Sequence, residues 1–460
     1  MPLDPFSRDA TRRDFLRSGA AVGVGAALTR FGFPAAGTTV KGVSPMPSGA
    51  TPFLAAAPMD VVRMGIVGVG GQGTSHVDIL LNVPGVNIVA ICDINQAHAE
   101  RAAQLCATAG RKRPTLYTRG PSDFERLCAE EKLDLVLTAT PWEWHVPVLL
   151  AAMKNGKHAA TEVPASYTPE GCWELVETAE RTQKHCVMTE NCNYGRSELL
   201  VLNLVRQGVL GEVLHAEGAY LHDLRAVQHD DGEGLWRRAH QITRNGNQYP
   251  THGLGPVANC LDINRGDRFE YVVSMSGPAR GLKAWQREHL AAADPRAQES
   301  YVQGDVNISL VKTANGRTLV VTHDVNLPRP YSRVNLVQGS KGIFMGYPDR
   351  VYVEGRSKRE HVWDDVTTWR EQYEHPLWRS EKIQQVRTGH GGMDYLEDYR
   401  LIQCLRQGVP TDMNVYDLAA VSSLTWSTEQ SVAGRSAPVD IPDYTKGKWK
   451  TTPAWPIVEA

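Results

Sequence analysis

The sequence predicts an α/β fold in which a doubly wound parallel sheet is followed by an α+β domain with a large, mostly antiparallel open sheet. Three observations support this. Short apolar runs alternate with helical patterns over residues 61–192, a glycine-rich turn joins the first run to the first helix, and period-two alternation with hairpin signals takes over from Gly211. We therefore expect a first domain over residues 61–192 and a second over residues 193–460.

Length and composition agree with folded domains of this kind. A chain of 460 residues is longer than one hydrophobic core fills, so about two to three domains are expected. Hydrophobic residues make up 42% and charged residues 22% of the chain, which is ordinary for a globular protein. The 49 basic and 51 acidic residues give a net charge of -2, which provides no basic surface for nucleic acid or an anionic membrane. A small-molecule or neutral partner fits better.

The eight cysteines lie far apart, with no CxxC pair and no zinc-type spacing of Cys and His. We therefore expect no metal. Most of them fall in apolar strand or helix patterns, where a buried inert thiol is the usual state and a disulfide the less common one. They are Cys92, Cys106, Cys128, Cys172, Cys186, Cys192, Cys260 and Cys404.

The first sixty residues are predicted to be a targeting signal followed by a linker. The paired arginines Arg12 and Arg13 precede an apolar run over residues 18–28 that is too short to cross a bilayer as a mature helix. This start resembles a twin-arginine export signal, although an exposed basic helix start would share part of the pattern. We predict a signal peptide over residues 1–36, a flexible linker over residues 37–60, and a periplasmic or secreted protein without a stable membrane anchor.

A glycine-rich turn follows the first apolar run and precedes a helical pattern over residues 74–81. Gly68 permits a tight turn, Gly70 lets the backbone approach a pyrophosphate, and Gly73 lets the helix pack close to the strand. The helix N-terminus would face the anion. The candidate cofactor loop of this Rossmann-type domain is Gly68, Gly70, Gly71, Gln72 and Gly73.

The second predicted strand, residues 87–93, indicates which cofactor binds. It ends at Asp93, 20 residues after Gly73, where a carboxylate accepts hydrogen bonds from an adenosine ribose. The same carboxylate repels a 2'-phosphate and no arginine follows it directly, so NAD is favoured over NADP. The alternative is a structural glycine turn followed by a strand-end Asp.

Later segments complete the first sheet and build the second. Residues 133–140, 158–162 and 186–192 are predicted strands of the first domain, and Thr168-Pro169 starts a helix. The predicted strands of the second domain are residues 213–222, 269–276, 306–312, 318–325 and 333–338, with a hairpin turn at Asn315-Gly316. A helix is predicted over residues 393–406, and the proline-rich tail from Ala437 is expected to return over the surface. The open face of the second sheet, turned toward the cofactor, would carry the substrate.

Three short motifs of the first domain resemble the Gfo/Idh/MocA oxidoreductases. They are Thr140-Pro141 with His145, Gly156-Lys157-His158, and Glu162-Val163-Pro164. The resemblance implies that several residues line the cofactor or the nicotinamide, namely Trp142, Glu143, Trp144, His145, Glu162, Val163 and Asn191. Val163 stands where that family has a catalytic lysine, so a plain dehydrogenase with a lysine acid/base is not expected. The tryptophans could instead be packing aromatics, and His145 a hydrogen-bonding residue at a helix start.

The densest polar segment of the second domain is Asn245-Gly246-Asn247-Gln248-Tyr249-Pro250-Thr251-His252-Gly253-Leu254-Gly255-Pro256. By itself it could be a turn whose Tyr249 and His252 bond local backbone groups, or a fixed loop that places side chains in a cleft. With Glu162-Val163-Pro164, it resembles glycoside hydrolase family 109, the NAD-dependent α-N-acetylgalactosaminidases. The resemblance extends from about residue 61 to the C-terminus.

That resemblance implies hydrolysis through transient oxidation of the sugar. In this route, bound NAD takes a hydride from C3 of the sugar, and the resulting ketone acidifies the C2 proton. A base removes that proton and the aglycone leaves C1. Water then adds, and the hydride returns to C3. The route needs no pair of carboxylates of the ordinary glycosidase type, and none is evident in the sequence. It also needs no supply of reducing equivalents after export with the cofactor bound.

The same resemblance names the candidate residues of the second domain. His252 is the first candidate for general acid/base at the C3 hydroxyl, because imidazole titrates near neutral pH. Tyr249 is the second, although a phenol needs a lowered pKa to act as a base. Arg237, or its neighbour Arg238, suits a polar sugar or an acetamide oxygen. The remaining candidate substrate contacts are Tyr220, Pro250, Thr251, Tyr331 and Tyr194. Residues 390–394 are expected to form the turn at the start of a helix and not a second polar edge of the substrate site.

Other functions stay open on the sequence alone. An exported NAD-dependent sugar oxidoreductase would release a keto sugar, and a related enzyme would cleave a different glycoside by the same route. A non-catalytic sugar-binding protein with this fold would leave His252, Tyr249 and the glycine turn without a chemical role. The exposed face of the second sheet is expected to support pairing of two copies of the chain.

Overall fold

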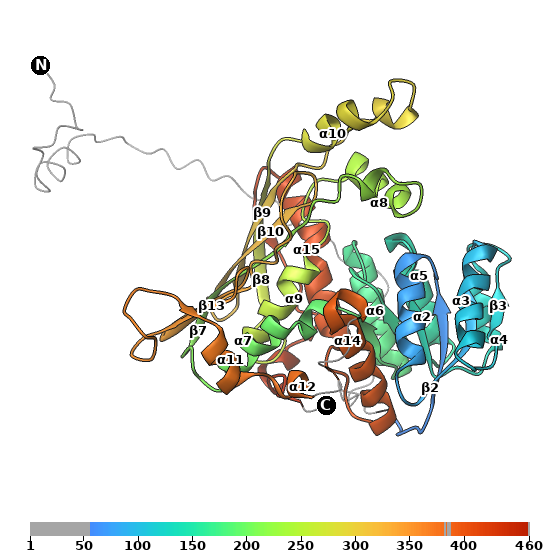
Figure 1. Cartoon of the computed structure of the whole chain (residues 1–460), viewed down its shortest axis with the longest axis horizontal. Helices are drawn as coiled ribbons and strands as arrows, with labels where there is room; N and C mark the ends of the chain where they lie inside the picture. The colour runs from blue at the N-terminus through green and yellow to red at the C-terminus, as the bar shows by residue number, and fades with distance from the viewer. Residues whose placement is uncertain (1–55, 381–382, 384–387, 459–460) are drawn as a thin grey trace, which may run out of the picture. The chain divides into compact units, whose positions relative to one another are not determined.

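The structure is a computed structural model that describes residues 56–380, 383 and 388–458. The predicted signal peptide over residues 1–36 and most of the predicted linker over residues 37–60 lie outside the described residues. Among the helices of those described ranges, none has the length and apolar character needed to cross a membrane. Figure 1 labels the elements named below.

The first sheet has six strands in the order β3-β2-β1-β4-β5-β6, and every neighbouring pair is parallel, which confirms the predicted sheet. The strand order reverses between β1 and β4, so a ligand is expected beyond the carboxyl ends of these strands. The strands are β1 (Val62–Val67), β2 (Val86–Cys92), β3 (Thr115–Tyr117), β4 (Leu135–Thr138), β5 (His158–Thr161) and β6 (Cys186–Met188).

The predicted strand over residues 186–192 was too long. β6 ends at Met188 because the chain then turns into the short 3-10 helix η1 (Asn191–Tyr194), whose Cys192 N–H donates to Glu190 Oε1 at 3.1 Å. Helices connect the parallel strands, and α6 begins at Pro169 as predicted, with Thr168 Oγ1 accepting the Gly171 N–H at 3.1 Å. These helices are α2 (Gly71–Leu81), α3 (Gln96–Thr108), α4 (Asp123–Glu130), α5 (Trp142–Lys154) and α6 (Pro169–Thr182).

The second sheet has nine strands in the order β14-β13-β12-β11-β7-β10-β9-β8-β15. Every neighbouring pair is antiparallel except β7 with β10, which confirms the predicted, mostly antiparallel sheet. The strands are β7 (Val213–Leu221), β8 (Phe269–Ser276), β9 (Asn307–Thr313), β10 (Thr318–Asp324), β11 (Leu336–Gly339), β12 (Gly342–Met345), β13 (Arg350–Val353), β14 (Asp364–Asp365) and β15 (Val439–Asp440).

Two predictions for this sheet need correction. The strand predicted over residues 333–338 begins only at Leu336, because Val334 and Asn335 have φ angles of 62° and 49° and cannot continue a pleated strand. The tail does more than cross the surface, since β15 pairs with β8 and adds an edge strand to the sheet.

Helix α9 (Thr251–Cys260) packs on β7 and shows that residues 245–256 are not a simple turn. A Cβ atom added to Gly253 would lie 2.1 Å from the backbone nitrogen of Ala219, and one added to Gly218 would lie 2.2 Å from the Gly253 oxygen. The two glycines therefore let the helix backbone lie directly on the strand. His252 is thus held on the first turn of a packed helix.

Helix α15 (Val415–Ala433) connects the two sheets. It starts with a capping box formed by Asn414 and Asp417, and it packs against both β8 and α6. Figure 1 shows α9 and α15 on the side of the second sheet that faces the first. This face is therefore covered by helices, which corrects the expectation that the open face is the one turned toward the cofactor.

The opposite face of the second sheet is the open one. Val272 and Ser274 of β8 are buried, so the alternate residue Met275 lies on the opposite face of the sheet, away from the packed helices. Met275 is 66%, Ile308 50% and Leu310 54% exposed. Apolar side chains are thus presented to solvent by two adjacent strands, β8 and β9.

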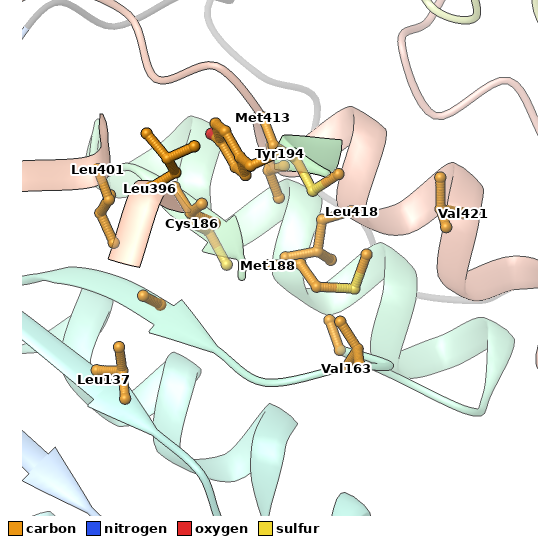
Figure 2. Packing of buried hydrophobic residues seen from close by; sticks show 14 of the residues in the cluster. Leu137, Val163, Cys186, Met188, Tyr194, Leu396, Leu401, Met413, Leu418 and Val421 are labelled. Carbon is orange, nitrogen blue, oxygen red and sulfur yellow. The ribbon is translucent and has the colours of Figure 1, made fainter. Parts of the chain in front are cut away.

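The hydrophobic core joins the first sheet to the C-terminal helices. Figure 2 shows Leu137 of β4 and Met188 of β6 near Leu396, Leu401 and Leu418. All eight cysteines are buried and free, as the sequence predicts. The remaining helices are α7 (Arg196–Arg206), α8 (Glu233–Thr243), α10 (Gly281–His289), α11 (Thr367–Tyr373), α12 (Pro376–Arg379) and α14 (Thr388–Gln407), with short 3-10 turns η2 (Val227–His229), η3 (Pro295–Gln298) and η4 (Lys448–Lys450).

Candidate active site

The glycine loop after β1 has the geometry expected of a pyrophosphate cradle. Gly68 has a φ of 79°, and a Cβ atom there would lie 2.9 Å from the Thr140 nitrogen. A Cβ atom at Gly73 would lie 1.9 Å from the Gly68 oxygen, so α2 can approach β1 only without a side chain. A Cβ atom at Gly70 would meet nothing within 4 Å, which means that the backbone faces open space there. These three features fit a nucleotide phosphate next to the start of α2.

Asp93 lies at the end of β2, beside this loop. Its Oδ2 accepts the Val69 N–H at 2.7 Å, and its Oδ1 accepts the Asn95 N–H at 2.7 Å. Each carboxylate oxygen keeps a further lone pair for a ribose hydroxyl. The next residue, Ile94, is 73% exposed and offers an apolar surface for an adenine. The loop and strand end therefore fit an NAD molecule, with Asp93 on the adenosine ribose.

His76 of α2 connects the loop to a buried acidic cluster. Its Nε2 lies 2.9 Å from Glu162 Oε1, and its Nδ1 lies 2.9 Å from Asp398 Oδ2. Burial alone would lower the pKa of His76, but the two carboxylates outweigh burial and raise its pKa well above the ordinary value. Burial would likewise raise the pKa of Glu162, but the His76 imidazolium lowers it. Glu162 therefore stays ionised next to the loop, where Gln72 Nε2 also donates to it at 3.0 Å.

Asn191 joins the same region to the start of α14. Its Nδ2 donates to Asp394 Oδ1 at 2.7 Å, and Asp394 Oδ2 lies 2.9 Å from His390 Nδ1. Burial would raise the pKa of Asp394, but His390 lowers it. Residues 389–392 all have positive φ angles, so the segment forms a turn at the start of the helix, as expected. The turn also presents a polar side chain, His390, toward Asn191.

His252 is paired with a buried carboxylate. Its Nδ1 lies 2.7 Å from Oε1 of Glu190, whose side chain is fully buried at the end of β6. A carboxylate can only accept, so Nδ1 carries the proton and Nε2 of the neutral ring keeps its lone pair. The side chain of His252 is 13% exposed. This pair has the arrangement of a general base with an orienting acid.

Aromatic side chains surround His252. The rings of Tyr249 and Tyr220 lie 4.9 Å and 5.2 Å from its ring, and 4.7 Å from each other. Tyr331 lies 6.2 Å from Tyr220, and Trp142 lies 5.9 Å from Tyr249. The structure therefore brings the predicted residues of both domains together in one aromatic cluster.

Arg237, not Arg238, belongs to this cluster. The Arg237 guanidinium lies 4.5 Å from the Trp236 ring and 5.6 Å from the Tyr249 ring. Arg238 points elsewhere, since its Nη1 donates to the Gln228 oxygen at 2.8 Å and its Nε lies 2.7 Å from Glu299. Burial raises the pKa of Tyr249 well above its ordinary value despite Arg237. Tyr249 is therefore suited to hydrogen bonding and not to proton abstraction.

Several predicted residues lie outside the aromatic cluster. Trp144 packs on Phe124 at 6.1 Å, and Glu143 is exposed on the first turn of α5. Both ring nitrogens of His145 lie 2.8 Å from backbone oxygens, those of Pro164 and Thr140.

Four further residues are held by packing or by local structure as well. Val163 is buried in the core shown in Figure 2, and its aliphatic side chain cannot take the acid/base role of the family's lysine. Tyr194 donates to Asp412 Oδ2 at 3.0 Å. Thr251 is fully buried, while Pro250 precedes α9 and sets the position of His252.

Reasoning from the sequence missed four polar residues of the site. Glu190 orients His252, His222 lies 3.1 Å from the Tyr220 hydroxyl through its Nδ1, and His76 and Asp398 hold Glu162. The one signal for Glu190 was its place at the carboxyl end of a predicted parallel strand, where ligands of such sheets bind. His76 carried a weaker signal, one helical turn after Gly73.

Two protein-family models match the chain. One, described as the oxidoreductase family with an NAD-binding Rossmann fold, matches residues 62–190, and the other, described as the C-terminal domain of glycosyl hydrolase 109, matches residues 194–451. A "Glycosyl hydrolase family 109 protein" of Shewanella sp. (strain W3-18-1) is 47% identical over 457 residues, covering 98% of this chain and 99% of that relative. A protein of the same name from Shewanella putrefaciens is 46% identical over the same share of both chains.

Solved structures share the fold at low sequence identity. An NAD binding oxidoreductase from Klebsiella pneumoniae has a TM-score of 0.66 and 18% identity, covering 84% of this chain and all of that chain. Levoglucosan dehydrogenase in complex with NADH and L-sorbose has a TM-score of 0.64 and 19% identity at the same coverage. The first domain is thus an NAD-binding Rossmann domain, and the chain as a whole belongs to glycosyl hydrolase family 109.

Proposed function

We propose that the chain is an NAD-dependent glycosidase that releases terminal α-N-acetylgalactosamine by transient oxidation at C3. The observation that carries the proposal is the pair of His252 and Glu190, which lies inside an aromatic cluster that begins with Trp142, just beyond the carboxyl end of β4. A sugar stacked on these rings would reach both the histidine and the cofactor side of the Rossmann sheet.

NAD, when bound beside the glycine loop and Asp93, would supply a reversible hydride acceptor for C3. The chain's own residues handle the protons. With Nδ1 held by Glu190, the Nε2 lone pair of His252 is available to take the proton of the C3 hydroxyl as C3 becomes a ketone. A base then removes the acidified C2 proton, the bond from C1 to the aglycone breaks, and the aglycone leaves with that proton. Water adds its hydroxyl to C1 and a proton to C2. The proton on His252 returns to the C3 oxygen, so the net reaction is hydrolysis.

A small pocket beside the aromatic cluster supports a sugar with an acetamido group. Trp142, Tyr220 and Tyr249 form part of its wall, and Gln228 and His323 also line it. Gln228 Nε2 donates to Asn326 Oδ1 at 2.9 Å, which leaves Gln228 Oε1 as an acceptor without a partner among the described residues.

His323 supplies the complementary group. Its Nδ1 also lacks a partner in the described part of the chain, and burial lowers its pKa to about 4, so the ring is neutral at pH 7. An acetamido group offers the N–H donor that Gln228 Oε1 needs and the carbonyl acceptor that a neutral His323 can bind. Leu224 and Val325 provide an apolar wall for its methyl group.

The proposal is tested with nitrophenyl glycosides in deuterium oxide, with and without added NAD. Release of N-acetylgalactosamine with deuterium at C2 is the expected result. Cleavage without deuterium at C2 would contradict the elimination step. Accumulation of NADH in proportion to a keto sugar would identify the chain as a sugar oxidoreductase instead.

We also propose export by the twin-arginine pathway, on the strength of Arg12, Arg13 and the apolar run that follows them. The expected result for Arg12→Lys combined with Arg13→Lys is retention of the precursor in the cytoplasm. A periplasmic or secreted variant would contradict this proposal.

A further inference from the structure

A cavity lies behind the pair of His252 and Glu190. It is lined by Glu190 after β6, by Glu397 of α14, and by Tyr194, Asn193 and Thr411. Its volume is about 20 Å³, counted as space open to the centre of a water molecule. One water needs roughly 10–15 Å³ on that measure. The cavity is therefore large enough to hold water, and the side chains of Glu190 and Glu397 both line it.

Three carboxyl oxygens around this cavity lack partners. Glu190 Oε2 and both oxygens of Glu397 are buried and have no hydrogen-bond partner in the described part of the chain. A buried acceptor without a partner is costly, and such groups in proteins are usually satisfied by water. Both side chains line the same cavity, so water there can satisfy them together.

Negative groups face Glu397 from every side. Asp394 and Asp398 belong to its own helix, Glu162 follows β5, and Glu190 and Asp412 lie along the cavity. The cations nearby are already engaged: His76 contacts Glu162 and Asp398, His390 contacts Asp394, and Arg400 Nη2 donates to Asp412 at 2.8 Å.

The carboxyl group of Glu397, the carboxyl group of Asp398 and the ring of His76 lie within 4.8 Å of one another. Burial, and then repulsion from Glu162, Asp394 and Asp398, raises the pKa of Glu397 well above its ordinary value. Two adjacent buried carboxylates cannot both remain charged without a cation. Glu397 is the member of this group that binds no cation in the described residues.

We propose that Glu397 is a positioning residue for the pair of His252 and Glu190, and that it holds a proton and donates it, through cavity water, in a hydrogen bond to Glu190 Oε2. The inference rests on the proposed role of His252. A donor on Oε2 withdraws electron density from Glu190, so the His252 ring gives up its proton more readily. An ionised Glu397 would have the opposite effect on His252, whose other titratable neighbours include Cys192, His222, Tyr220 and Tyr249.

The test follows His252 itself and does not depend on hydrolysis. Protein carrying its cofactor is labelled with ¹³C in the histidine rings, the His252 signal is assigned by its loss in His252→Gln, and its titration is compared in Glu397→Gln and Glu397→Leu. Glutamine keeps a neutral donor at this position, whereas leucine removes the donor. Glu180→Leu is the matched control, because Glu180 is a mostly buried carboxylate that contacts Lys446 and Tyr416 and does not line the cavity.

We expect the titration midpoint of His252 to stay in place in Glu397→Gln and in Glu180→Leu, and to rise by about one pH unit in Glu397→Leu, as loss of one charge-assisted hydrogen bond predicts. An unmoved midpoint in Glu397→Leu overturns the inference, and so does an equal rise in Glu397→Gln. If the leucine variant does not fold, infrared difference spectra of the wild type and Glu397→Gln decide whether a protonated acid is present at pH 7. Failure to cleave any glycoside would remove the proposed function without changing these results.

Discussion

Glu190 Oε1 accepts a hydrogen bond from Nδ1 of His252 at 2.7 Å, across 62 positions of the sequence. The contact joins the carboxyl end of β6 in the Rossmann sheet to the first turn of α9 on the second sheet. The catalytic histidine of the proposed mechanism is thus oriented by the domain that binds the cofactor. Any variant that separates these two residues should affect catalysis more than folding.

The first prediction concerns this pair. His252→Ala should lower kcat by about 10²–10⁴-fold, the usual contribution of general acid/base catalysis, with NAD still bound. Glu190→Gln should also lower kcat, because an amide can hold the imidazole in the wrong tautomer. The measurements are steady-state kinetics and the NAD content of the purified protein. His215→Ala, on β7 and outside the aromatic cluster, is the control, and normal turnover by His252→Ala would remove this histidine from the mechanism.

The second prediction separates the two roles of the glycine loop. A methyl group at Gly70 points into open space, so Gly70→Ala should leave the melting temperature of the cofactor-free protein nearly unchanged but reduce its NAD content. A methyl group at Gly73 meets the Gly68 oxygen at 1.9 Å, so Gly73→Ala should lower the melting temperature itself. Full NAD content in Gly70→Ala would show that this position does not face the phosphates.

The third prediction concerns recognition of the acetamido group. Gln228→Leu removes the acceptor that faces the small pocket, so KM for an N-acetylgalactosaminide should rise about tenfold, the value of roughly one hydrogen bond. The corresponding galactoside, which has a hydroxyl at C2, serves as the control and should show a much smaller change. An equal change for both substrates would assign Gln228 to the packing of the pocket.

Local patterns in the sequence predicted the strands better than they predicted the site. Period-two alternation located β8 to the residue, and Asn315-Gly316 located the hairpin between β9 and β10, because both signals depend on neighbouring residues only. Helix α9 could not be predicted in this way. Its glycines and prolines are typical of a turn, and the close contact of Gly253 with Gly218 of β7 is a long-range feature that local patterns do not show.

In the candidate site, too, the parts formed by neighbouring residues could be predicted and the parts formed by distant residues could not. The glycine loop and Asp93 form one local unit, and their spacing alone indicated a dinucleotide. Glu190 and Glu397 carry no periodicity or motif, and they gain a role only where β6, α9 and α14 meet in space. Arg237 and Arg238 are a similar case, since nothing in the sequence distinguishes the guanidinium on the aromatic rings from the one that contacts Glu299.

The fourth prediction concerns pairing through the open face of the second sheet. Ile308 and Leu310 are half exposed on β9, next to Met275 of β8, and such a patch indicates an interface. We expect the wild type to be a dimer in light scattering after gel filtration, and Ile308→Lys with Leu310→Lys to be a monomer. Lys132→Glu, at an exposed position before β4, is the control, because it lies outside the second sheet. A monomeric wild type would contradict the prediction.

The last prediction concerns stability in acid. His158 and His185 are buried side by side, and Nδ1 of His158 accepts the backbone N–H of His185 at 3.0 Å, which requires an unprotonated nitrogen. Burial lowers the pKa of His158 to about 3 and that of His185 to about 4, against an ordinary value of 6.5. Below pH 6.5 these two histidines therefore bind protons in the unfolded chain but not in the folded chain. The free energy of unfolding decreases as the pH is lowered. By pH 4, His158 alone should cost about 3 kcal/mol.

The measurement is urea denaturation between pH 7 and pH 4 for the wild type and His158→Gln. Glutamine can accept the same N–H but does not titrate, so the variant should lose less stability as the pH falls, with a slope smaller by about 1.4 kcal/mol per pH unit below pH 6. The exposed His361→Gln should follow the wild type. Parallel curves for the wild type and His158→Gln would mean that His158 is protonated in the folded protein, and that its contact with His185 breaks without a large loss of stability.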